Sequence, residues 1–190
     1  MSRPLDRHRR FIASLEALAD RQDRGALAAL RRGLGKKPGE VADVYPYVLP
    51  WLPSTASPRE EDAYFLVAGL FALHPHSWHP RDDEGRSNLG ASFARLMASD
   101  GSPSIEKRFV ALLNCHLDDL PAHLRSAVGL LKAHEIPIDW AQLLSDILSW
   151  HWDTRAVQRE WARAFWGQSA AQAGAPGAGD TITDQPQSVA

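Results

Sequence analysis

Residues 57–74 read SPREEDAYFLVAGLFALH, and this stretch decides the class of fold. Ser57 is followed by Pro58 and, after one arginine, by three acids. This is the pattern of a helix N-terminus, where a side-chain oxygen caps free amides and the helix dipole favours negative charge. The residues that follow, to about His74, are apolar on nearly every side of the expected helix. Because a helix that is apolar all round is buried, we predict a central helix with other helices packed around it.

The composition of the whole chain supports a helical fold. Leu and Ala account for 51 of the 190 residues, whereas Val, Ile and Thr together account for 18. Straight side chains favour helices and β-branched ones favour sheets, so we predict an all-α protein. The content of 44% apolar residues and seven Trp excludes a disordered chain. The single cysteine excludes an internal disulfide and a cysteine-based zinc finger.

Helical spacing of apolar residues recurs in both halves of the chain, for example at 11–19 and 140–148. Asp100, Gly101 and Pro103 interrupt this pattern. We therefore predict a two-lobed helical bundle protein. Its parts are an N-terminal helical lobe at residues 1–101, a C-terminal helical bundle at 102–167 and a flexible tail at 168–190.

Neither a membrane span nor an export signal is expected. The longest apolar run, residues 63–73, has eleven residues and is too short to cross a bilayer. Arginines lie near the N-terminus, but the apolar segment of a signal peptide does not follow them. We expect a cytoplasmic protein without a membrane partner.

The sequence gives little indication of catalysis. His74, His76 and His79 fall in a polar loop without the fixed spacing that zinc ligands require. Cys115 and His116 are adjacent, and adjacent side chains on a helix point about 100° apart, which is poor geometry for a thiolate–imidazolium pair. The chain has no phosphate loop and no hydrolase or metalloprotease motif. We predict a protein without catalytic residues, metal or cofactor, with a His-ligated metallohydrolase as an alternative.

Charge is distributed unevenly along the chain. Residues 1–37 hold ten Lys and Arg against four acids, and residues 38–106 hold four against ten. Basic side chains also recur on the predicted outer faces of later helices, about 6 Å apart along each helix, and such rows can follow a nucleic-acid strand. Cations near a helix C-terminus also complement the helix dipole, so ordinary solvated faces remain the alternative. The candidate nucleic-acid-binding residues are Arg24, Arg31, Arg32, Lys36, Lys37, Lys107, Arg108, Arg125, Lys132, Arg155 and Arg159.

Seven short segments, in order, resemble a known family. They read RGALAALRR at 24–32, YFLVAGLF at 64–71, SNLG at 87–90, SIEKRF at 104–109, LPAHLR at 120–125, IPIDWA at 136–141 and VQREWA at 157–162. Each is generic, but their order and spacing resemble CasB, the small subunit of the type I-E CRISPR surveillance complex Cascade. The tail and the loop at 74–79 lie outside this resemblance.

The resemblance implies an all-helical, two-lobed and non-catalytic subunit that works in antiviral defence. It implies that two copies lie head to tail, contact guide RNA (crRNA) and DNA strands, and pack on the backbone and large subunits of Cascade. The family's arginine pair falls on Arg31 and Arg32, its basic pair on Lys107 and Arg108, and its helix arginine on Arg125. The remaining candidates come from helical spacing and charge alone.

A free-standing helical DNA-binding regulator is the other alternative. The helices expected around 124–131 and 140–148 are joined by a short turn and suggest a helix-turn-helix. The candidate recognition helix, residues 139–150, has no Arg, Lys or Asn and offers Gln142 alone for reading base edges.

Overall fold

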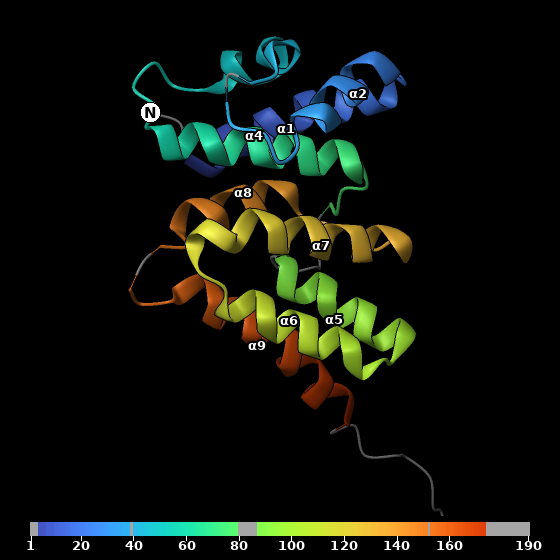
Figure 1. Cartoon of the computed structure of the whole chain (residues 1–190). Coiled ribbons are helices and arrows are strands. Elements are labelled where there is room, and N and C mark those ends of the chain that lie inside the picture. Colours follow the sequence, from blue (N-terminus) through green and yellow to red (C-terminus); the bar gives the residue numbers. More distant parts are fainter. Residues whose placement is uncertain (1–3, 39, 80–86, 152, 174–190) are drawn as a thin grey trace, which may run out of the picture.

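The computed structural model describes residues 4–38, 40–79, 87–151 and 153–173, and it confirms the all-α prediction (Figure 1). The described residues form helices and one isolated β-bridge, without a strand. The α-helices are α1 (Pro4–Asp20), α2 (Arg24–Gly33), α3 (Tyr45–Val48), α4 (Pro58–Leu73), α5 (Leu89–Asp100), α6 (Pro103–Asn114), α7 (Leu120–Ala133), α8 (Trp140–Ser149) and α9 (Ala156–Ala173). Three 3-10 turns join them, η1 (Ala42–Val44), η2 (Leu49–Trp51) and η3 (Leu117–Asp119).

Local capping residues set several helix starts. The Ser57 hydroxyl accepts a hydrogen bond from the Glu60 amide at 3.2 Å, which fixes the first turn of α4. Asp23, Asn88 and Asp139 cap α2, α5 and α8 in the same way, each accepting from an amide three residues on. Gly101 ends α5 in a left-handed conformation, with φ of 69°, that disfavours side chains. The start at Ser57 and the stop at Gly101 are the ones that the sequence signals predict.

The central helix of the prediction is α4. Its residues from Ala63 to Ala72 are mostly buried, and they include Tyr64 and Phe71 at 0% exposure. Helix α2 covers one side of α4, while α7 and α8 cover another (Figure 1). Neighbouring helices therefore bury α4 on several sides. This accounts for the lack of a polar face on α4, because such a face would have no contact with water.

Helices that precede residue 101 pack against helices that follow it. Helix α5 packs mainly along α9, and α8 packs along α1 and α4 (Figure 1). The buried apolar residues of these helices form one continuous core. The position of a boundary between two lobes stays a prediction. At the C-terminal end, α9 continues to Ala173, beyond the expected start of the tail at residue 168, and residues 174–190 lie outside the described part of the chain.

Candidate functional site

The predicted cations all lie at the surface. Each of the eleven is exposed in the structure, from Arg24 at the start of α2 to Arg159 on α9. They differ in how firmly ion pairs and hydrogen bonds hold their side chains. Arg32 forms an ion pair with Asp43 at 2.9 Å, and the Arg31 Nε donates to the Leu27 carbonyl one turn earlier, at 3.1 Å.

Arg155 is the most strongly engaged of the set. Its Nη2 donates to the Leu113 carbonyl at 2.6 Å, near the end of α6, where helix carbonyls lack intrahelical partners. Its backbone has a φ of 49°, a left-handed conformation just before α9. Arg155 therefore joins the end of α6 to the start of α9, a structural role that the basic stripe on α9 does not reveal.

Two basic segments that are distant in the sequence meet at the turn after α2. The Arg125 side chain of α7 reaches Gly35, where an added Cβ would lie 3.5 Å from Arg125 Nη1. Lys36 and Lys37 follow Gly35 directly. Arg125 therefore extends the basic N-terminal block across onto α7. The other exposed cations of the set lie on later helices, and their place on the same face stays a prediction; they are Lys107, Arg108, Lys132 and Arg159.

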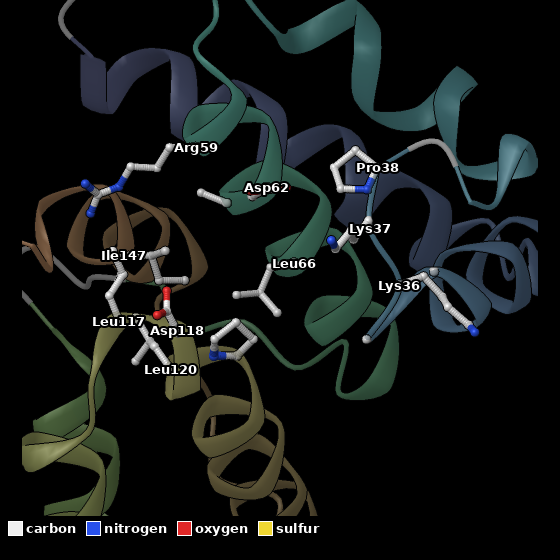
Figure 2. Close-up of a pocket in the computed structure, with 14 residues that line it drawn as sticks. Lys36, Lys37, Pro38, Arg59, Asp62, Leu66, Leu117, Asp118, Leu120 and Ile147 are labelled. Atoms are coloured by element: carbon white, nitrogen blue, oxygen red, sulfur yellow. The ribbon is translucent and has the colours of Figure 1, made fainter.

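A groove of about 690 Å³ opens beside this cluster, and we call it the central groove. It is lined by the turn at residues 33–38, by α4, by the η3–α7 junction and by Ile147 of α8. Both Lys36 and Lys37 belong to the lining, and Figure 2 shows the Lys37 amine directed into the groove and the Lys36 amine directed away from it. The two neighbouring amines therefore point to different surfaces.

Arg59 in the central groove was missed by the sequence analysis. Its side chain is partly exposed, yet its Nη2 is shielded from solvent and has no hydrogen-bond partner among the described residues. Burial lowers the pKa of the guanidinium from its usual value. The sequence did contain one signal for it. A cation in the first turn of a helix is unfavourable next to the positive end of the helix dipole, so an arginine at this position suggests a role other than helix stabilisation. Arg59 stands there beside Glu60 and Glu61.

The histidine loop has a structural role. The Ser77–Ile138 bridge docks residues 76–78 on the α7–α8 connection, and His74 Nε2 lies 2.8 Å from the Ile136 carbonyl. Since the carbonyl can only accept, this nitrogen carries a proton and donates. Burial lowers the pKa of His74, which keeps the ring neutral. Within the described ranges, no group of three His, Cys, Asp or Glu side chains could hold a metal ion.

The remaining alternatives find little support in the geometry. Burial and the nearby Asp119 raise the pKa of the Cys115 thiol, so it stays protonated, unlike a nucleophilic cysteine. The candidate recognition helix, α8, has six buried residues and no exposed one, because it packs on α1 and α4. A helix enclosed in this way cannot enter a DNA groove, so the helix-turn-helix hypothesis is wrong. None of the described helices has the length and apolar character needed to cross a membrane.

Comparison with known proteins identifies the family. The sequence profile of the CRISPR-associated protein Cse2 family matches residues 26–166. A CRISPR-associated protein Cse2 of Thermus thermophilus is 39% identical over 150 residues, which cover 77% of this chain and 82% of that protein. The crystal structure of M. ruber CasB is 34% identical with a TM-score of 0.70, covering 88% of this chain and 96% of that one.

A chain of a CRISPR RNA-guided surveillance complex has a similar structure. It superposes with a TM-score of 0.74 at 28% identity, covering 90% of this chain and 99% of that chain. Profile, sequence relative and structures agree with the resemblance that the sequence analysis found. The chain belongs to the Cse2 (CasB) family of CRISPR-associated proteins.

Proposed function

We propose that this chain is the non-catalytic small subunit of a type I-E Cascade, and that it holds guide RNA and DNA strands by their phosphates. Its partners would be the backbone and large subunits and a second copy of itself, head to tail. The similarity to a chain of an RNA-guided surveillance complex supports the place in an assembly. In such a complex base pairing reads the sequence, and protein cations are left to hold the strand backbones.

The observation that carries the nucleic-acid contact is the meeting of Arg125 with the turn at Gly35. It joins α7 to the basic block that contains Arg24, Arg31 and Lys36, all exposed. A cation cluster that spans two elements can follow a strand over several phosphates, whereas a single helix stripe meets fewer. The scarcity of base-reading amides on these faces favours binding without sequence preference.

The test measures target binding by a reconstituted complex over a salt series. Replacing Lys36 and Arg125 together by Gln removes two of the proposed phosphate contacts. We expect the complex to assemble normally and the slope of log affinity against log salt to become shallower by about 0.7 for each lost contact with a single strand. Affinity for target DNA falls at low salt.

Arg163→Gln is the matched control, because Arg163 is an exposed helix arginine that is ion-paired with Glu160. This variant should leave the salt slope unchanged. An unchanged slope in the Lys36/Arg125 variant, with the subunit folded and incorporated, would show that these cations do not contact the strands.

A further inference from the structure

The floor of the central groove is aliphatic. Leu66 of α4, Leu117 of η3, Leu120 of α7 and Ile147 of α8 contribute to its lining, together with Pro121. These residues come from four elements that are fixed by the core around α4 and α8. The volume of about 690 Å³ lies within the usual range for sites that bind small molecules or side chains. The groove is therefore a built depression with room for several side chains.

Two cations face this aliphatic floor. Lys37 points into the groove from the turn after α2, and Arg59 lines it from the first turn of α4 (Figure 2). The Arg59 side chain is partly exposed, and its Nη2 has no hydrogen-bond partner among the described residues. An acceptor oxygen brought into the groove would accept hydrogen bonds from this guanidinium, which has five N–H donors. A carboxylate suits both a guanidinium and an ammonium.

The lining favours polypeptide over a nucleic-acid strand. Among the described residues, no aromatic side chain lines the groove, whereas single-stranded bases are usually seated on aromatic rings. Asp62 and Asp118 also belong to the lining, so the groove carries charges of both signs. An apolar centre with charges of both signs around it is the usual composition of a protein–protein interface.

We infer that the central groove docks a segment of another Cascade subunit, with aliphatic side chains on the floor and separate acidic side chains at Lys37 and at Arg59. This inference rests on the place in Cascade proposed above. It assigns the two lysines to different partners, because Lys37 serves the protein segment and Lys36 serves the strand surface.

Photocrosslinking identifies the occupant directly. A benzoylphenylalanine replaces Asp62, an exposed residue of the groove lining, in the full chain. The chain is reconstituted with the other Cascade subunits and guide RNA, irradiated, and analysed by mass spectrometry after nuclease treatment. We expect a crosslinked peptide from a different subunit, with Leu, Ile or Met next to Asp or Glu. The same group at Ala111, an exposed α6 residue outside the groove, should not give that peptide.

Charge reversal gives an independent measurement. Lys37→Glu should weaken incorporation of the labelled subunit into a complex that lacks it by about tenfold, as expected when one partner of a shielded charge pair is reversed. Arg163→Glu is the matched control, because it makes a charge reversal of the same size at an exposed α9 residue outside the groove, and it should alter incorporation less than about twofold. Thermal melts of the free variants confirm that both are folded.

The outcomes are distinguishable. A crosslink from position 62 to RNA or DNA, to a second copy of this chain, or to nothing in an assembled complex overturns the docking site and leaves the place in Cascade intact. Equal effects of Arg163→Glu and Lys37→Glu also overturn it. A wild-type chain that does not enter the complex at all overturns the docking site and the proposed function together.

Discussion

Asp146 is a buried carboxyl between α8 and α9. Its Oδ2 accepts from Trp161 Nε1 at 2.6 Å, and its Oδ1 accepts from Gln142 Nε2 at 2.8 Å. Burial outweighs these hydrogen bonds and raises the pKa of the carboxyl from 3.8 to about 7. Between about pH 4 and about pH 7 the folded protein therefore binds more protons than the unfolded chain. The free energy of unfolding falls as pH rises through this window, and the penalty is complete above it.

The variant Asp146→Asn should remove this penalty. An amide still accepts from Trp161, and it can donate to Gln142 once the Gln142 amide rotates. We expect the variant to be more stable than wild type at pH 8 by roughly 1–3 kcal/mol, with the difference shrinking towards pH 5. Urea unfolding at both pH values measures it. Asp146→Ala is the control, because it leaves the Trp161 N–H without an acceptor and should destabilise at both pH values. An Asn variant weaker than wild type at pH 8 would contradict the raised pKa.

At the scale of elements, the tightest crossing joins α5 to α9. A Cβ added to Gly90 would lie 2.1 Å from the Trp161 carbonyl oxygen and 2.7 Å from its Cα. Both atoms belong to backbone, which cannot rotate aside as a side chain can. We expect Gly90→Ala to force the two helices apart and to cost about 3 kcal/mol or more of unfolding free energy.

Gly129→Ala in α7 is the matched control for this prediction. Apart from its chain neighbours and the backbone of its own helix, no atom of the described residues lies within 4 Å of the added Cβ there, and alanine is a better helix former than glycine by about 1 kcal/mol. This variant should be as stable as wild type or more stable in the same urea titration. Equal stability of the two alanine variants would show that α5 and α9 do not cross as closely as described.

The positions of most helices could be predicted from the sequence, whereas the packing of one helix against another could not. Ser57, Asp139 and Gly101 act on their own helix ends, so a local pattern is enough to find them. The pairing of α5 with α9 depends on which faces fit across the folded chain, and no local signal records it. The same holds for the site: exposure of the cations follows from helical spacing, whereas the Arg125–Gly35 contact and the groove around Arg59 arise only from tertiary packing.

At the scale of the whole molecule, one core spans both halves of the chain. Helix α8 supports α1 and α4, and α9 supports α5, so neither half keeps its core covered alone. We expect a single cooperative unfolding transition, with tryptophan fluorescence and far-UV circular dichroism giving the same midpoint in urea. Most of the tryptophans that report on the second half, such as Trp140 and Trp161, are buried, so their signal follows that core. Two separated midpoints would show lobes that unfold independently.

The α5–α9 pairing also governs when the protein can fold in a cell. A ribosome that has just finished α5 must translate from Asp100 to Ala173 before the partner helix exists. At 5–20 residues per second this takes roughly 4–15 s. During that interval the face of α5 around Gly90 and Phe93, which ends up buried, is open to chaperones or to a neighbouring nascent chain. Native α5 packing therefore has to wait for synthesis of α9, and slow synthesis of the second half lengthens the period in which the chain can be trapped or degraded.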